Sequence, residues 1–360
     1  MVERNALDSL KMIAWEVTRS CNLACSHCRA SSKFGPYQNE LTTQECFQLI
    51  DELAAFGKPE GDGLASYSQS HSLLVILTGG EPLLREDIFQ IIEYGHKQGL
   101  KLVMAPNGTL LNEENVKKII ASGIKRISVS LDGPDEASHD QLRHVPGAFK
   151  RAQQGIERAK SLGLEFQINS TISKRNIKSL AEIIKLAKDL GAKAHHIFLL
   201  VPTGRAKEMV NEELSAQEYE EALKLFSQEK KNSPLDLKAT CAPHFNRILL
   251  QEHADKACSL RGRGCMGGVS FCFISHTGDL QPCGYLEIKC GNVRDEGFKK
   301  AWLTSEVFNN LRDFSKYKGK CGVCEFQAVC GGCRARAFAK TRDYLAEEPY
   351  CTYEPLKRAR

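Results

Sequence analysis

The stretch Cys21-Asn-Leu-Ala-Cys-Ser-His-Cys28 places three cysteines at C-x3-C-x2-C spacing, directly after the apolar run Met12–Thr18. Three thiolates on so short a loop can face one metal centre. A 4Fe–4S cluster has four irons, so three protein ligands leave one iron free to bind a small molecule. A structural zinc ion takes four ligands, and no fourth lies nearby in the sequence, so zinc or scattered buried cysteines are weaker interpretations.

Strand-like and helix-like stretches alternate from this loop outward, which indicates a parallel sheet with outer helices. The predicted strands are Met12–Thr18, Leu73–Gly79, Lys101–Asn107, Arg126–Asp132, Glu165–Thr171 and Ala194–Val201. The predicted helices are Thr42–Phe56, Glu86–Gln98, Asn112–Ser122, Ala148–Leu162 and Asn176–Leu190. The strands look apolar on both faces, as in a parallel sheet. We therefore predict an α/β fold, a partial (β/α)6 TIM barrel, followed by a cysteine-rich region.

Polar or glycine-rich segments follow the predicted strands, and the carboxyl ends of barrel strands are where chemistry takes place. These segments are Cys21–Cys28, Thr78–Pro82, Asn107-Gly108, Ser130 with Asp132-Gly133, Asn169 with Thr171, and Pro202–Arg205. The fold would bring them to one mouth. Taken alone, Gly79–Pro82 could be an ordinary turn, and Arg143 a solvated charge near a helix end.

The composition sets limits on location and partners. The chain has 360 residues and a net charge of +5, with no dense basic stretch, so we expect no nucleic acid. It has no apolar run long enough to span a membrane and no secretory signal at its start, so we expect no membrane partner and a cytoplasmic location. In a reducing compartment, the fifteen cysteines favour metal ligation over disulfides.

Ten of the fifteen cysteines lie between Cys258 and Cys351. One part of this region reads C-x12-G-x4-C from Cys265 to Cys283, and a later part reads C-x2-C-x5-C-x2-C from Cys321 to Cys333. Paired C-x2-C units also occur in zinc ribbons, which is the alternative interpretation.

The N-terminal loop and the segments after it resemble the radical S-adenosylmethionine (SAM) enzymes. The resemblance implies that Cys21, Cys25 and Cys28 hold a 4Fe–4S cluster whose open iron binds SAM. It assigns contacts with SAM to a further set of residues: His27, Gly79, Gly80, Glu81, Pro82, Asn107, Ser130 and Arg143. His27 stands where the family often has an aromatic residue. No further catalytic side chain is identified.

The C-terminal cysteines resemble the SPASM extension of these enzymes, which carries two auxiliary 4Fe–4S clusters. Position by position, one cluster would take Cys321, Cys324, Cys330 and Cys351, and the other Cys258, Cys265, Cys283 and Cys333. The gap before Cys333 is shorter than the usual pattern. Cys272 and Cys290 are alternative ligands, and Cys46 and Cys241 are expected to be buried thiols. The expected domains are 1–205 (barrel), 206–257 (bridging region) and 258–360 (SPASM).

Longer segments resemble the haem-biosynthesis branch of the SPASM enzymes: Trp15–Ala30, Met104–Leu110, Phe198–Arg205 and Cys330–Ala337. This resemblance implies oxidative decarboxylation of two propionates of Fe-coproporphyrin III to vinyl groups, giving haem b, with a low-potential electron donor. Cations expected to meet the substrate carboxylates are Arg29, Arg205, Arg334 and Arg336. Rival functions are action on another tetrapyrrole (haem d1 or sirohaem side chains), peptide maturation, and a non-catalytic iron–sulfur carrier.

Overall fold

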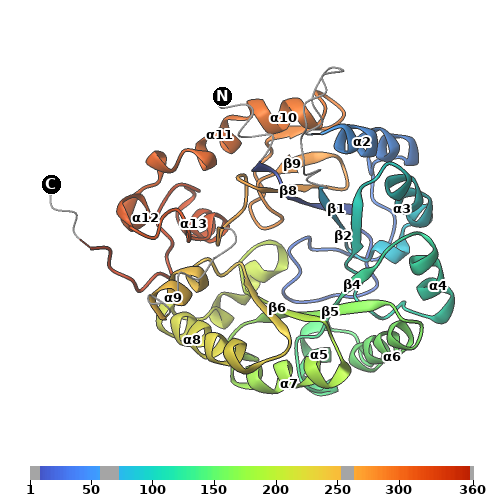
Figure 1. Cartoon of the computed structure of the whole chain (residues 1–360), viewed down its shortest axis with the longest axis horizontal. Helices are drawn as coiled ribbons and strands as arrows, with labels where there is room; N and C mark the ends of the chain where they lie inside the picture. The colour runs from blue at the N-terminus through green and yellow to red at the C-terminus, as the bar shows by residue number, and fades with distance from the viewer. Residues whose placement is uncertain (1–8, 57–72, 253–262, 357–360) are drawn as a thin grey trace.

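A ten-stranded sheet curves through the centre of the protein, with helices around its outside (Figure 1). The computed structural model describes residues 9–56, 73–252 and 263–356. All six predicted strands are present and parallel: β1 Met12–Thr18, β2 Leu74–Gly79, β3 Lys101–Met104, β4 Arg126–Ser130, β5 Glu165–Ile172 and β6 Ala194–Leu199. The strand order β1 to β6 follows the chain, so the predicted partial barrel is confirmed.

The predicted helices are also present and cover the outer face of the sheet (Figure 1). They are α2 Thr43–Ala55, α3 Ile88–Lys97, α4 Glu113–Ala121, α6 Ala148–Ser161 and α7 Leu180–Leu190, and α5 Glu136–Arg143 lies between β4 and α6. Thr42 and Asn112 cap α2 and α4, since each side chain accepts a hydrogen bond from the first helical turn. The sequence did not predict α5, because its residues are mostly polar and show no apolar periodicity.

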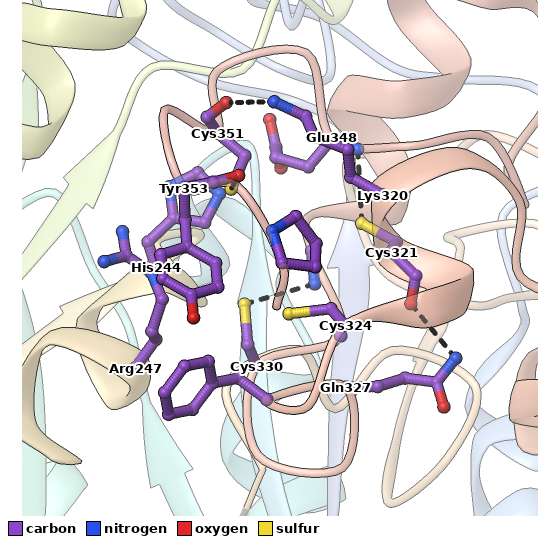
Figure 2. A pocket seen from close by; sticks show the side chains of 14 residues that line it. His244, Arg247, Lys320, Cys321, Cys324, Gln327, Cys330, Glu348, Cys351 and Tyr353 are labelled. Carbon is purple, nitrogen blue, oxygen red and sulfur yellow. Dashed lines mark hydrogen bonds between the residues drawn. The ribbon is translucent and has the colours of Figure 1, made fainter. Parts of the chain in front are cut away.

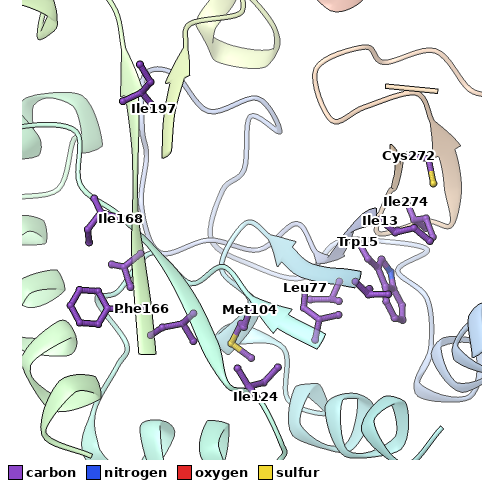
Figure 3. Close-up of a cluster of buried hydrophobic side chains, with 14 of the residues drawn as sticks. Ile13, Trp15, Leu77, Met104, Ile124, Phe166, Ile168, Ile197, Cys272 and Ile274 are labelled. Carbon is purple, nitrogen blue, oxygen red and sulfur yellow. The ribbon is translucent and has the colours of Figure 1, made fainter. Parts of the chain in front are cut away.

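The core lies between the outer face of the sheet and these helices (Figure 3). Ile13 and Trp15 of β1, Leu77 of β2 and Ile168 of β5 are fully buried there. The alternate positions on several strands are only half-buried, as in the pattern of β5. The expectation of two fully buried faces was therefore wrong, because the inner face lines the barrel interior rather than a second layer of helices.

Four further strands extend the sheet beyond the predicted six. β7 Asp236–Thr240 pairs in parallel with β6, and β8 Phe271–Ile274 pairs in parallel with β1. β9 Asp279–Gln281 and β10 Gly291–Asn292 continue from β8 in antiparallel fashion. β8, β9 and β10 belong to the cysteine-rich region, so this region joins the same sheet as the barrel.

The remaining elements are mostly short: η1 Pro82–Leu84, η2 Ile177–Ser179, η3 Gly204–Glu212, α8 Ala216–Asn232, α9 His244–Glu252, α10 Phe298–Thr304, α11 Glu306–Arg312, η4 Phe314–Lys316, α12 Gly319–Val323 and α13 Arg334–Thr341. No helix in the described ranges is long and apolar enough to cross a membrane. The predicted ligand Cys258 lies outside the described residues.

Candidate active site

The cysteine loop after β1 is held by backbone hydrogen bonds from several parts of the barrel. Cys21 N donates to Lys33 O at 3.0 Å, and Ser26 N donates to Leu142 O, at the end of α5, at 2.9 Å. The side chains of Cys21 and Cys25 are buried, and Cys28 is half-buried. The loop is therefore fixed by its backbone, which leaves its three thiols free for a ligand.

A buried pair of charges lies directly behind this loop. Arg143 Nη2 and Asp132 Oδ2 are 2.5 Å apart, and Arg143 Nη1 lies 3.4 Å from Cys25 Sγ. Burial raises the pKa of Cys25, while the Arg143 guanidinium acts in the opposite direction. A cation beside a thiol stabilises its thiolate, the form that ligates iron. In this structure Arg143 thus serves the cysteine ligand, and its predicted contact with SAM stays a prediction.

His27 lies within the same group of charges. Its Nε2 is 3.5 Å from Asp132 Oδ2, and burial lowers the pKa of His27 to about 4. The imidazole is therefore neutral at physiological pH. The adenine contact itself stays a prediction.

The Gly79-Gly80-Glu81-Pro82 segment packs against the start of the cysteine loop. A Cβ atom on Gly80 would come within 2.2 Å of Ser20 O, and one on Gly79 within 2.4 Å of Thr18 O. Only glycine permits this close approach of two backbones. Gly80 N donates to Thr18 O, and Glu81 N donates to Ser20 O. The two glycines thus join the end of β2 to the residues that lead into Cys21.

Glu81 is fully buried and organises backbone rather than facing the barrel mouth. Its carboxylate accepts hydrogen bonds from Asn107 N at 2.6 Å and Leu83 N at 3.1 Å. Burial raises the pKa of Glu81 to about 7. Asn107 in turn donates from Nδ2 to Asn22 Oδ1 at 2.8 Å, inside the cysteine loop. The contacts with SAM predicted for Glu81, Asn107, Pro82 and Ser130 stay predictions.

Arg205 reaches back from the end of β6 to the cysteine loop. Its Nε donates to Cys25 O and its Nη1 donates to Ser32 O, both at 2.7 Å. A Cβ atom on Gly204 would lie 2.1 Å from Arg29 O, so glycine is needed for this approach. Arg205 therefore fixes the cysteine loop, and only its Nη2 atom is left for a substrate carboxylate.

Arg29 lies at the inner face of the sheet, between β1 and β8. Its Nη1 is 3.0 Å from Glu16 Oε2, and its guanidinium lies 4.3 Å from the centre of the Phe273 ring. The second oxygen of Glu16 contacts His276 Nδ1 at 2.7 Å. Burial by itself would raise the pKa of Glu16. The nearby Arg29 and His276 outweigh this effect and lower the pKa of Glu16 to about 2. Arg29 is thus held at the barrel interior, where its predicted contact with substrate stays open.

Four of the predicted auxiliary ligands line a single cavity of about 390 Å³ in the C-terminal region. These are Cys321, Cys324, Cys330 and Cys351 (Figure 2). Backbone N–H groups point at two of the sulfurs: Glu348 N at 3.4 Å from Cys321 Sγ, and Gly332 N at 3.5 Å from Cys330 Sγ. Donors of this kind stabilise thiolates bound to a cluster. The donor set, four cysteines around one pocket, fits a 4Fe–4S cluster.

Arg334 and Arg336, which the sequence suggested for the substrate, are buried beside these cysteines. Arg334 Nη1 donates to Ala346 O at 2.6 Å, and its Nη2 lies 3.4 Å from Cys321 Sγ. Arg336 forms a buried ion pair with Glu348 at 3.2 Å. Both guanidinium groups are thus engaged by neighbouring residues of the protein, and the substrate role predicted for them stays a prediction.

Cys272 and Cys290, the predicted alternative ligands, lie in the apolar core that faces the helices. Cys272 is fully buried on β8, and Cys290 precedes β10. They are therefore separated from the cavity of Cys321 and Cys324, and their role as alternative ligands has no support in the structure.

A groove between η3 and α13 was not predicted from the sequence. It is open to solvent and is lined by the cationic residues Lys207, Lys340 and Arg342 and by the aromatic rings of Tyr285 and Phe338. The alternation of cationic and apolar residues along α13 was the signal in the sequence. Such a wall suits a flat apolar ligand with acidic substituents.

No group of three or more His, Cys, Asp or Glu side chains in the described part of the chain is arranged to hold a single metal ion. The thiols of a 4Fe–4S cluster bind different irons and so need not converge on one point. The described cysteines therefore offer no preformed zinc site of the kind that a zinc ribbon would need.

Comparisons with known proteins agree with this geometry. Residues 15–187 match the Radical SAM superfamily, and residues 265–334 match the SPASM iron–sulfur cluster-binding domain. The fold is similar to that of Streptococcus suis SuiB bound to S-adenosylmethionine, with a TM-score of 0.73 at 15% identity, over 96% of this chain and 77% of that one. The chain is thus a radical SAM protein with a SPASM domain.

Within this class, two relatives are much closer in sequence. An AdoMet-dependent heme synthase of Nitratidesulfovibrio vulgaris is 48% identical over 96% of this chain and 93% of its own length. Another, from Methanosarcina barkeri, is 46% identical over 97% of this chain and 98% of its own. The chain belongs to the family of these heme synthases, which the sequence resemblance predicted.

Proposed function

We propose that this protein is a radical SAM oxidative decarboxylase that converts two propionates of Fe-coproporphyrin III to vinyl groups, giving haem b. The observation that carries the proposal is the pairing of two sites in one fold. A three-cysteine loop lies at the barrel mouth, and a four-cysteine cavity lies in the C-terminal region. The names of the relatives at 46–48% identity support the tetrapyrrole substrate.

The reaction needs both sites. A cluster on Cys21, Cys25 and Cys28, with SAM bound, would supply the radical chemistry that removes a hydrogen atom from the propionate carbon next to the macrocycle. The propionate must then lose CO2 and one further electron to become a vinyl group. A fully ligated auxiliary cluster is suited to accept that electron, because it has no open iron. Two propionates react, so two SAM molecules are consumed, and a low-potential donor starts each cycle.

The chain's own residues position the reactants. Cys21, Cys25 and Cys28 would hold the SAM-binding cluster, and Arg143 keeps a positive charge beside Cys25. Arg205 and the Gly79-Gly80 segment fix the loop backbone, so the cluster has a defined position relative to the barrel interior. Positioning and exclusion of water are what a protein contributes to chemistry carried by its cofactors.

The groove between η3 and α13 is the proposed entry site for the porphyrin. Lys340 Nζ lies 2.9 Å from Glu213 Oε2, and Lys207 Nζ lies 3.9 Å from Glu287 Oε2. Lys207 and Glu287 are exposed, so a propionate can replace Glu287 as the partner of Lys207 at small cost. Glu213 is buried, and Lys340 is half-exposed beside it at the wall of the groove. Tyr285, which lines the groove, packs against the same buried cluster as Cys283. That cluster contains Cys333, so the groove adjoins part of the cysteine-rich region.

The direct test is anaerobic incubation of the reconstituted protein with Fe-coproporphyrin III, SAM and dithionite. The expected products are haem b, two CO2 and 5′-deoxyadenosine, identified by mass spectrometry. Unchanged Fe-coproporphyrin III under conditions where SAM is cleaved would overturn the substrate assignment. In that case the same assay with a haem d1 precursor, sirohaem-derived porphyrins or a peptide tests the rival functions.

The groove has its own test, with a matched control. Lys340→Glu is expected to raise the KM for Fe-coproporphyrin III about tenfold, because it replaces an attractive charge with a repulsive one. Lys185→Glu, which changes an exposed lysine paired with Asp189 on α7, is expected to leave KM unchanged. Equal KM values for the two variants would remove the groove from the proposal.

A further inference from the structure

His244, the first residue of α9, is a buried histidine whose ring nitrogens make no hydrogen bond. Its side chain is completely buried, and neither Nδ1 nor Nε2 has a hydrogen-bond partner among the described residues. His139, His195 and His276 are also buried, but each has one ring nitrogen bonded to a neighbouring group. An imidazole carries at least one N–H group, and buried N–H groups in proteins nearly always have an acceptor. His244 therefore needs an acceptor that the described part of the chain does not provide.

The ring of His244 lies at the wall of the four-cysteine cavity. It lines this cavity together with all four cysteines that the sequence assigned to one auxiliary cluster (Figure 2). The ring of Tyr219 packs against the imidazole edge to face, with the ring centres 5.0 Å apart and an angle of 70° between the planes. This contact fixes the orientation of the imidazole. The ring nitrogens are thus held at the boundary of the space in which a cluster would lie.

Arg247, three residues further along α9, lines the same cavity (Figure 2). Residues at this spacing share one face of a helix. The guanidinium is buried, and it pairs with Glu220 through Nη2 and donates to Gln251 Oε1 through Nη1 at 2.7 Å. Its Nε, by contrast, has no hydrogen-bond partner in the described part of the chain. One face of α9 therefore brings two side chains with unpaired N–H groups to the wall of the cavity.

We propose that His244 donates a hydrogen bond from its ring to a sulfur of the cluster in the four-cysteine cavity, and that this bond raises the reduction potential of that cluster. Reduction adds negative charge to the sulfurs, so a donor stabilises the reduced form more than the oxidised form. A higher potential favours the uptake of the electron that the substrate loses. The inference rests on the cluster that the proposed function places in this cavity. It leaves the four cysteine ligands unchanged and does not depend on which tetrapyrrole is the substrate.

The test is a redox titration of the full-length protein, reconstituted without oxygen and followed by EPR spectroscopy of the reduced clusters. His244→Phe keeps an aromatic ring against Tyr219 but removes both nitrogens. It is expected to shift the reduction equilibrium of one auxiliary cluster about tenfold toward the oxidised form, which lowers its potential by about 59 mV. His244→Gln restores an N–H donor and is expected to recover part of this shift. No porphyrin is added, so failure of the proposed substrate cannot affect the result.

His195→Phe is the matched control. His195 is equally buried, on β6, and does not line the cavity, so this variant is expected to keep the potentials of all clusters. Wild-type potentials in His244→Phe with full iron content would overturn the proposal, as would an equal shift in His195→Phe. A wild-type protein without any auxiliary-cluster signal would instead contradict the proposed function.

A second measurement does not require His244→Phe to fold or to bind iron. Pulsed EPR of the reduced protein, labelled with 15N-histidine, detects a histidine nitrogen that is hydrogen-bonded to a cluster. The protein carries His27→Phe, which removes the histidine of the N-terminal cysteine loop. We expect a weak 15N coupling to an auxiliary-cluster signal, and its absence would overturn the proposal.

Discussion

The two cysteine regions of this protein collect their ligands in different ways. The N-terminal loop provides three cysteines within eight residues, fixed by backbone hydrogen bonds to the barrel. The C-terminal cavity gathers four cysteines from a stretch of thirty-one residues, Cys321 to Cys351. Three ligands leave an iron open for SAM, whereas four leave none. In the proposed function, the number of ligands would therefore separate the site that binds a small molecule from the site that transfers electrons.

The buried charges, in contrast, are alike in the two regions. Behind the N-terminal loop, Arg143 contacts both Cys25 and Asp132. In the C-terminal region, Arg334 contacts Cys321, and Arg336 pairs with Glu348. Each region thus places an arginine against a cysteine sulfur, which indicates that both sets of thiols are built to carry negative charge.

The largest expected effect comes from removing one cysteine from each region. Cys25→Ala should reduce SAM cleavage to background, because the N-terminal cluster loses one of only three ligands. Cys324→Ala should still produce 5′-deoxyadenosine but no haem b, because the electron acceptor is lost. Chromatography of both products from one anaerobic reaction measures this. SAM cleavage by Cys25→Ala, or normal haem b formation by Cys324→Ala, would contradict the separate roles proposed for the two cysteine regions.

A second prediction concerns the buried ion pair behind the loop. Arg143→Met should lower the free energy of unfolding by about 3–5 kcal/mol, since it leaves the Asp132 carboxylate buried without its partner. Arg126→Met, which removes an exposed ion pair with Glu165, should cost under about 1 kcal/mol. Denaturant titration compares the two. The double variant Arg143→Met/Asp132→Asn should recover part of the loss, and no recovery would contradict the assigned pairing.

Most of the barrel could be predicted because its signals are local. The six strands follow apolar runs, and the cysteine spacing at Cys21–Cys28 identifies the loop. The signals that failed were long-range. β7 has a single fully buried apolar residue, Leu237, so its sequence does not look like a strand. The burial of Arg336 and the position of Cys241 depend on contacts between segments about a hundred residues apart, which no spacing rule contains.

A third prediction tests the close packing that fixes the loop. Gly80→Ala should destabilise the protein by about 1–3 kcal/mol and weaken SAM binding, because its Cβ atom would meet backbone at Ser20 O. Gly95→Ala in α3 is the control, since its Cβ would meet only the end of the Leu102 side chain. Thermal unfolding with and without SAM measures both effects. Equal losses of stability and of SAM binding in Gly80→Ala and Gly95→Ala would show that Gly80 is not needed for the close approach to the backbone at Ser20.

A last prediction is a pH dependence due to Glu81. Its pKa is raised from 4.5 to about 7, so the folded state favours the protonated form. The associated stability is fully present below pH 4.5 and is lost as the pH rises through 7, by up to about 3 kcal/mol. Melting temperatures of the wild type and Glu81→Gln between pH 5.5 and 8 should therefore diverge, with the wild type falling more. Parallel pH profiles would contradict the raised pKa.

The most direct test of the central claim is EPR spectroscopy of the anaerobically reconstituted, dithionite-reduced protein with and without SAM. We expect SAM to change one cluster signal, and this change to be absent from Cys25→Ala and present in Cys324→Ala. An N-terminal loop filled by zinc, or a spectrum that SAM leaves unchanged in the wild type, would contradict the assignment of an open iron to the three-cysteine loop.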